Sequence, residues 1–300
     1  MATLRDLRQR IGAIKNTEKI TAAMRVVAST KLRRAQQAIL AARPYTLKIQ
    51  EILGNLSAAK EEEYFHPLLR KPKEIKNVAV LVITSDRGLC GSFNSNLLKN
   101  AMYHITQKLP SEHKNMNVST IAVGKRAVAF FAKANVNLIR QYPDIFAKLD
   151  FSTAEDIATL VADGFTDEKF DRVEIIFNEF KSIIRQEVKL TNLLPIEPVL
   201  TPQAQKAASL HPERTIDYIF EPTKGDIMDV LLPKYLKIQV WRALLESNAA
   251  EQAARMMAME TASKNAKDLI NNLTLSYNKA RQAAITKEML EIVGGAEALK

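Results

Sequence analysis

The apolar positions divide the chain into two helical ends and a middle with a different period. Towards the C-terminus they recur mostly at steps of three and four residues, as on one face of an α-helix. They are Leu236, Val240, Ala243, Ala250, Ala254, Met257, Leu269, Leu273, Ala280 and Ala284. The 60 residues from Lys234 to Val293 contain neither glycine nor proline. The sequence therefore predicts one helix with a length of roughly 90 Å, beginning near Asp226.

A second helical stripe occupies the start of the chain. Its members are Leu4, Leu7, Ile11, Ile14, Ile20, Met24, Val27, Ala35, Ala38 and Ala42. Many positions in both stripes are alanine, and small side chains let two helices approach closely. We expect residues 1–60 and 225–300 to form a long antiparallel coiled coil, with part of the longer helix left unpaired. An ordinary all-α bundle is the alternative, although its helices are rarely half this long.

Pro44 interrupts the N-terminal pattern. Proline has no N–H group to give to the preceding turn, so it should kink or break this helix.

The middle of the chain has the pattern of an α/β domain, which we place at residues 75–222. Val78–Thr84 is a continuous apolar run, as in a parallel strand buried on both faces. Further strands are expected at 118–123, 172–177 and 183–194, the last at an edge because it alternates, and 217–221 adds a short one. Helices are expected at 93–109, 125–134 and from Ser152, which forms a capping box with Glu155, to Phe165. This alternation predicts a small doubly wound, Rossmann-like domain inserted between the two long helices, with residues 195–211 as a loop.

Composition limits the class of protein and the charge indicates a partner. The chain has 47% hydrophobic and 25% charged residues, with no apolar run long enough to cross a bilayer and no secretory signal. A single cysteine, Cys90, excludes an internal disulfide, and the four histidines lack ligand spacing, so no structural metal is expected. Residues 1–50 hold eleven Lys or Arg against two acidic residues, a net of +9. An acidic partner should face this segment.

The strongest candidate for chemistry is the turn Ser85–Gly91, which follows the first strand where a doubly wound domain binds nucleotides. It has two glycines and lacks the Gly-Lys-Ser/Thr ending of a phosphate loop. We interpret it as a tight turn, with Cys90 as a small buried apolar group. No carboxylate pair or serine elbow stands out, so we expect neither catalysis nor a cofactor, and a nucleotide-dependent enzyme is the weaker alternative.

The basic cluster Arg25, Lys31, Arg33 and Arg34 belongs to the N-terminal helix. A solvated helix face would explain it, and so would a coiled-coil protein that binds nucleic acid. The cluster has no interleaved aromatic residue before Tyr45 and no recognisable nucleic-acid module around it. An acidic protein partner fits better.

Five blocks of sequence carry a resemblance to a known family. They are Ile285–Ala296 (ITKEMLEIVGGA), Asn16–Met24 (NTEKITAAM), Ser85–Gly91 (SDRGLCG), Met257–Glu260 (MAME) with Ala266, and Asn278–Ala283 (NKARQA). Together they resemble the γ subunit of F-type ATP synthase over the whole chain. Such a subunit is a rotor shaft that couples proton or sodium flow through a membrane c ring to ATP synthesis and hydrolysis on the β chains. It has no catalytic residues of its own.

The resemblance also implies partners and contact residues. The shaft would stand in a hexamer of α and β chains, and the α/β domain would lie at its foot against the ε subunit and the c ring. Arg281, Gln282 and Thr286 match positions that contact a β-chain loop, and Lys19, Met24 and Arg25 match a patch facing the acidic lever of β. Arg33 and Arg34 extend that basic region. The tip, with Leu290, Ile292 and Val293, matches an end held in an apolar collar.

The implied location is peripheral, at the cytoplasmic face of a bacterial inner membrane rather than the mitochondrial matrix face. The dithiol switch of the plant chloroplast branch cannot form with Cys90 alone.

Overall fold

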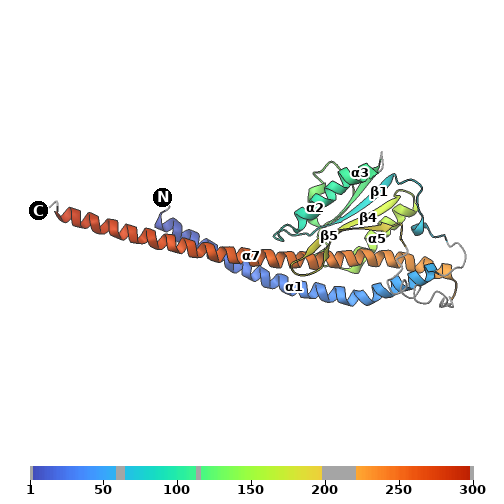
Figure 1. The fold of residues 1–300 in the computed structure, drawn as a ribbon, viewed down its shortest axis with the longest axis horizontal. Helices are drawn as coiled ribbons and strands as arrows, with labels where there is room; N and C mark the ends of the chain where they lie inside the picture. Colours follow the sequence, from blue (N-terminus) through green and yellow to red (C-terminus); the bar gives the residue numbers. More distant parts are fainter. Residues whose placement is uncertain (1–2, 59–64, 113–115, 198–220, 298–300) are drawn as a thin grey trace, which may run out of the picture. The chain divides into compact units, whose positions relative to one another are not determined.

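The computed structural model describes residues 3–58, 65–112, 116–197 and 221–297 and separates into two units (Figure 1). The coiled-coil unit comprises Met1–Thr30 and Arg255–Lys300, and the sheet unit comprises Lys31–Ala254. Helices α1 (Leu4–Ala58) and α7 (Lys224–Glu297) each contribute residues to both units.

In the coiled-coil unit α1 and α7 pack along a seam with the alternating three- and four-residue steps of a heptad repeat. Its buried and half-buried members are Leu4, Leu7, Ile11, Ile14, Glu18, Thr21 and Ala28 in α1, and Met259, Ser263, Ala266, Ile270, Leu273, Tyr277 and Ala280 in α7. The Thr21 and Ser263 hydroxyls lie 3.1 Å apart, and Lys267 Nζ is 3.8 Å from Glu18 Oε1. The earlier residue of α1, Glu18, therefore pairs with the later residue of α7, Lys267. The two helices run antiparallel, which confirms the prediction.

Three details of the predicted stripes are wrong. Ile20 and Val27 are 60% and 56% exposed, because the next residues, Thr21 and Ala28, face α7 instead. The predicted stripe followed the larger apolar side chains, whereas the seam follows the 3.5-residue repeat and accepts a threonine whose hydroxyl is paired. Leu269 is also exposed. Finally, α7 continues through Gly294 and Gly295 to Glu297 instead of ending at Val293.

The sheet unit contains one five-stranded sheet in the order β3-β2-β1-β4-β5. The strands are β1 (Asn77–Ile83), β2 (Asn117–Val123), β3 (Asn137–Tyr142), β4 (Arg172–Phe180) and β5 (Gln186–Leu194). The first four are parallel, and β5 runs antiparallel to β4 at the edge. The doubly wound prediction and the edge position of the last strand are confirmed, whereas β3 was missed.

Both faces of the sheet are covered (Figure 1). Val78, Val80 and Val82 of β1 pack against α2 (Phe93–Tyr103), the π-helical turn η2 (His104–Lys108), α3 (Leu109–Glu112) and α4 (Lys125–Phe131). The alternate residues of β1 face α5 (Phe151–Thr166), the short helix η1 (Pro67–Leu69) and the segments of α1 and α7 in this unit. Burial on both faces explains the continuous apolar run of β1.

Other boundaries differ from prediction. Helix α5 begins at Phe151 with Asp150 as its N-cap, whose carboxylate accepts a 2.9 Å hydrogen bond from Ser152 N–H, so the Ser152–Glu155 capping box is wrong. Helix α7 begins at Lys224. Most of the expected 195–211 loop and of the 217–221 strand lies outside the described residues, and Glu221 itself is in a bend.

Helix α1 continues through Pro44 without a break. A proline at position 44 deprives the Leu40 carbonyl of its partner in the helix. Leu40 and Pro44 are both on the exposed side of α1, where the Leu40 carbonyl can bond to solvent instead. The break that we considered at this position is therefore absent.

Candidate interaction surfaces

The end of α7 is an exposed helix with one apolar side. Every residue from Arg281 to Gly295 is exposed, because α1 begins at Leu4 and the seam ends at Ala280. The large apolar side chains exposed here are Ile285, Met289, Leu290, Ile292 and Val293. Ile285, Met289, Ile292 and Val293 are related by steps of three, four and seven residues and share one side of the helix, away from the Lys287–Glu291 ion pair of 3.6 Å, and Leu290 lies at the edge of that side. Exposed apolar surface of this kind indicates a protein partner.

Arg281, Gln282 and Thr286 begin this exposed end. The Thr286 hydroxyl donates to the Gln282 carbonyl at 3.0 Å, a bond within the helix. Among the described residues, the Arg281 guanidinium and the Gln282 side-chain amide have no hydrogen-bond partner, and both are exposed. These donors are therefore available to acceptors on another chain. The structure places all six predicted α7 residues on this one stretch.

The basic residues of α1 are also exposed. In the coiled-coil unit Lys19 and Arg25 are exposed, as are Ile20 and Val27, and Met24 is half-buried. Helix α1 therefore presents both basic and apolar groups to solvent in this unit. In the sheet unit Arg33 and Arg34 are exposed, and neither has an ion-pair partner among the described residues. A carboxylate-rich partner could pair with these groups without displacing any internal contact.

The turn after β1 is held by the carboxylate of Asp86. Its Oδ1 accepts hydrogen bonds from the backbone N–H groups of Lys125 (2.9 Å) and Asp144 (3.0 Å), and its Oδ2 accepts from Phe146 N–H (2.8 Å). One side chain thus joins the loops that follow three adjacent strands. Sequence reasoning gave this turn no such role, because its partners lie 39 to 60 residues further on.

Cys90, in the same turn, is buried against Phe93 and Ala250 as predicted, but its Sγ also accepts a 3.1 Å hydrogen bond from Asn94 Nδ2. Leu89 and Gly91 both have positive φ, of 63° and 58°, which confirms the tight turn. Nearby, Gly124 has φ of 90°, and a Cβ there would lie 2.2 Å from the Thr84 carbonyl oxygen. Only glycine fits this approach of two loops.

A charge cluster joins the sheet to α7. Glu179, at the end of β4, lies 2.6 Å from Lys181 Nζ, 2.7 Å from Lys189 Nζ and 3.7 Å from Arg242 Nη2. Arg242 also donates from Nε to Glu246 Oε1 at 2.8 Å. Burial acts to raise the pKa of Glu179, but the bonds from Lys181 and Lys189 outweigh it and hold that pKa below its usual value. Sequence spacing gave no signal for this cluster.

A second polar contact is buried under α2 and η2. His104 Nε2 lies 2.5 Å from Glu174 Oε2, and Arg172 Nη1 lies 3.3 Å from the other carboxylate oxygen. Both His104 and Glu174 are buried. Their mutual bond satisfies two polar groups inside the domain, which is a structural role.

Comparisons with known proteins identify the family. A family model described as ATP synthase matches residues 3–299. The ATP synthase gamma chain of Chlorobium phaeobacteroides (strain DSM 266 / SMG 266 / 2430) is 49% identical over 300 residues, covering the whole of both chains. That of Chloroherpeton thalassium is 46% identical over 302 residues, covering 100% of this chain and 99% of the relative.

Solved structures show the same fold. A chain from the central stalk and c ring of the Tetrahymena thermophila mitochondrial ATP synthase has a TM-score of 0.56 and 27% identity, covering 81% of this chain and 99% of that one. A chain of the Euglena gracilis mitochondrial ATP synthase rotor has a TM-score of 0.61, covering 94% and 98%. At 18% identity it shows the fold alone.

The fold has paired terminal helices and an inserted doubly wound domain, and the ATP synthase family model matches the chain over nearly the full length. The chain is therefore a subunit of an ATP synthase. Within that class the chain belongs to the gamma chain family, whose members form the central stalk of the complex and are not its catalytic part. This confirms the resemblance to the γ subunit. It rules out the two alternatives, a coiled-coil protein that binds nucleic acid and a nucleotide-dependent enzyme. In the part of the chain that the structure describes, no helix is both long and apolar enough to cross a membrane.

Proposed function

We propose that the chain is the rotating shaft of its ATP synthase, coupling proton or sodium flow through a c ring to ATP synthesis and hydrolysis on β chains. The observation that carries this proposal is the bare end of α7, where residues 281–295 expose an apolar side and unpaired donors. A helix end of that kind suits the centre of an enclosing protein hexamer.

Coupling follows from asymmetry. Three chemically alike sites around one shaft each meet a different side of it, since α7 here is apolar on one side and charged on the other. A contact that favours one conformation of a β chain shifts that chain towards it. Turning the shaft then carries each site through its states in sequence.

The exposed residues divide into two roles. Arg281, Gln282 and Thr286 hold a loop of β by hydrogen bonds to the shaft. Leu290, Ile292 and Val293 centre the tip in an apolar collar formed by the hexamer. The support is that donors and apolar groups occupy successive stretches of the same bare helix.

The basic residues of α1 face the acidic lever segment of β. Lys19, Met24 and Arg25 would make one contact patch, and Arg33 and Arg34 a second. Exposed ion pairs contribute only about 0 to 1 kcal/mol each, and more where the contact excludes water. Several together would then favour one rotary position of the lever.

The sheet unit would form the foot, in contact with the ε subunit and the c ring. The solved relatives are described as parts of a rotor and of a central stalk with its c ring. By this proposal the chain works as a peripheral protein at the cytoplasmic face of a bacterial inner membrane, without cofactor, metal or nucleic acid.

Two variants test the division of roles. Deleting the tip from Leu290 onward should lower assembly stability and speed while rotation persists, because the paired helices remain. Arg281→Leu with Gln282→Leu should slow catalysis in complexes that assemble normally. Single-molecule rotation, with subunit composition checked on a gel, distinguishes them. If assembled complexes with the deletion stop turning while the double variant turns normally, the roles are wrong.

The shaft itself has a simpler test. Affinity-tagged chain should co-purify with α and β chains and ATPase activity, whereas the isolated chain should hydrolyse no ATP. Turnover by the isolated chain would refute the proposal.

A further inference from the structure

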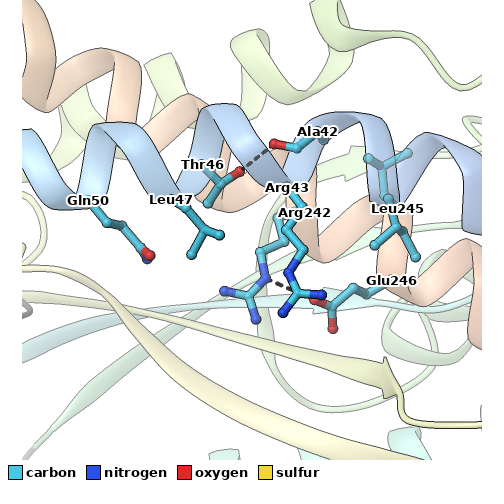
Figure 2. Close-up of a pocket in the computed structure, with 9 residues that line it drawn as sticks. Ala42, Arg43, Thr46, Leu47, Gln50, Arg242, Leu245 and Glu246 are labelled. Atoms are coloured by element: carbon cyan, nitrogen blue, oxygen red, sulfur yellow. Dashed lines mark hydrogen bonds and ion pairs between the residues drawn. The ribbon is translucent and has the colours of Figure 1, made fainter. Parts of the chain in front are cut away.

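The sheet unit contains a cleft between α1 and α7 that is lined in part by Arg242 and Glu246 of the charge cluster and has no part in the proposed function (Figure 2). Its volume is about 340 Å³, which is within the range of small binding pockets. Its lining consists of Ile39, Ala42, Arg43, Thr46, Leu47 and Gln50 from α1, and Arg242, Leu245 and Glu246 from α7.

Small side chains keep the cleft open. Ala42 and Thr46 occupy the α1 seam at this level, and the Thr46 hydroxyl turns back to the Ala42 carbonyl at 3.1 Å. One and two turns further along, Ile49 and Leu53 fill the seam and are buried in the main core. The gap between the helices is therefore local and follows from the size of two side chains.

Arg43, in the α1 wall, lies between two exposed apolar side chains, of which Leu47 lines the cleft and Leu40 lies just outside its lining. Leu40 and Leu47 are 62% and 52% exposed, and Arg43 lies between them on the same side of the helix, at steps of three and four residues. Among the described residues, Arg43 has neither an ion pair nor a side-chain hydrogen bond. Its guanidinium can therefore bind an anion without giving up an existing contact.

The α7 wall offers an unfilled acceptor. Glu246 is only 8% exposed; one of its oxygens accepts from Arg242 Nε, while Oε2 is buried without a hydrogen-bond partner among the described residues. Figure 2 shows Arg43 and Arg242 extending from the two helices towards Glu246. A buried acceptor without a partner is unfavourable, and a ligand that donates a hydrogen bond to it would remove that cost.

From these contacts we infer that the cleft binds a peptide segment that presents a carboxylate beside apolar side chains. The carboxylate pairs with Arg43, a peptide N–H donates to Glu246 Oε2, and the apolar side chains cover Leu40 and Leu47. A phosphate backbone fits less well because it has no donor for Glu246. The inference rests on the proposed function in one respect: the segment belongs to a neighbouring subunit of the same complex.

Photo-cross-linking in the purified, assembled ATP synthase tests this inference. Leu47 is replaced by p-benzoylphenylalanine in one variant and Tyr45 in a control, because Tyr45 is similarly exposed at 58% but does not line the cleft. Position 47 should cross-link to a segment of another subunit that contains Asp or Glu, identified by mass spectrometry, and position 45 should not.

Charge variants at Arg43 complete the test. Adding Arg43→Glu to the position-47 variant should lower the cross-link yield about tenfold, because it sets two carboxylates against each other. Adding Arg43→Lys should retain most of the yield. No cross-link at position 47, equal cross-linking from both positions, a captured segment without a carboxylate, or a yield unaffected by Arg43→Glu would each overturn the inference. Subunit composition and ATPase activity of the same preparations report separately on the proposed function.

Discussion

Replacing Glu179 by glutamine should destabilise the sheet unit more than its single lost charge suggests. The Glu179 carboxylate is the only anion among the described residues that contacts Lys181, Lys189 and Arg242 together. The amide keeps the shape of the side chain but removes its charge. Three cations would then remain near one another around a neutral group.

The magnitude follows from burial. Removing one partner of a fully buried ion pair costs about 3 to 5 kcal/mol. Glu179 is buried, but Lys181, Lys189 and Arg242 keep between 38% and 47% of their side-chain surface exposed, so solvent screens much of the effect. Arg242 also keeps its bond to Glu246. We therefore expect a loss of about 1 to 3 kcal/mol in the free energy of unfolding.

Urea unfolding of the full chain as a function of pH is the assay. The pKa of Glu179 in the folded chain is below its ordinary value of 4.5, so its stabilising contribution is present above that value and is lost as the pH falls through the folded pKa. The difference between wild type and Glu179→Gln should accordingly be constant near neutral pH and shrink below about pH 4.5.

Glu187→Gln is the matched control. Glu187 is on the neighbouring strand and pairs with Arg185, but its side chain is 42% exposed. It should change the free energy of unfolding by less than about 0.5 kcal/mol. Equal losses for the two variants, or a Glu179→Gln difference that persists undiminished in acid, would refute the reasoning.

Three further substitutions test other features. Asp86→Asn should lower the free energy of unfolding, measured with urea, by about 1 to 3 kcal/mol, because charge-assisted bonds to three backbone N–H groups are weakened. Asp144→Asn is its control and should change that free energy little, because the Asp144–Lys125 pair of 3.3 Å is exposed. Gly124→Ala should cost at least about 2 kcal/mol in the same assay, whereas Gly12→Ala, with nothing within 4 Å of the added methyl group, should be neutral or stabilising. Changing Lys19, Arg25, Arg33 and Arg34 together to glutamine should lower ion pumping per ATP hydrolysed, as raised salt does; unchanged coupling would reduce these residues to a solvated surface.

The sequence was most informative where one physical requirement applies over many residues. A helix of this length must bury a stripe, so the two stripes predicted the pairing of α1 with α7. The exact register was harder, because Thr21 can occupy the seam only if Ser263 lies opposite it, 242 residues away. No local pattern contains that information, so Ile20 was favoured instead.

Strands were predictable according to their burial. β1 is buried on both faces and is an unbroken apolar run, whereas β3 is an edge strand with exposed Arg140 and Gln141. An exposed edge need not be apolar on either face, so composition gave no signal for it. Similarly, Asp150 rather than Ser152 caps α5, because either residue type can serve and tertiary packing decides between them.

For the candidate contact residues, the sequence predicted the residue type and its exposure but not the partner within the fold. Basic and apolar residues on bare helices follow from sequence, and the structure leaves Arg281, Gln282 and Leu290 exposed as expected. Pairs from distant elements do not follow. Asp86 with Phe146, Glu179 with Arg242, and Arg43 beside Glu246 become neighbours only through the fold.

Helix α7 is buried in the sheet unit and exposed at its C-terminal end, and this difference matters for how a shaft could transmit force. In the sheet unit the residues from Ala243 to Ser247, and again those from Ala249 to Ala253, are all buried in unbroken succession. Because consecutive residues point to every side of a helix, this segment is covered on every side apart from the cleft beside Leu245 and Glu246. In the coiled-coil unit α7 is half-covered up to Ala280 and bare beyond it. Under the proposed function, the bare end meets the β chains and the enclosed segment resists twisting, because turning it would break close-packed contacts.

Weakening the enclosed segment tests whether it anchors the shaft. Ala250 is fully buried and packs against Cys90 and Phe93. Ala250→Gly removes that methyl group and loosens the helix by about 1 kcal/mol, without changing any residue proposed to contact β. The torque measured in single-molecule rotation should therefore fall in complexes that still assemble. Ala41→Gly is the matched control, since Ala41 lies on the exposed side of α1 in the sheet unit and outside the residues proposed to contact β. Undiminished torque in a stably assembled Ala250→Gly complex, or an equal loss from Ala41→Gly, would show that the anchor lies elsewhere.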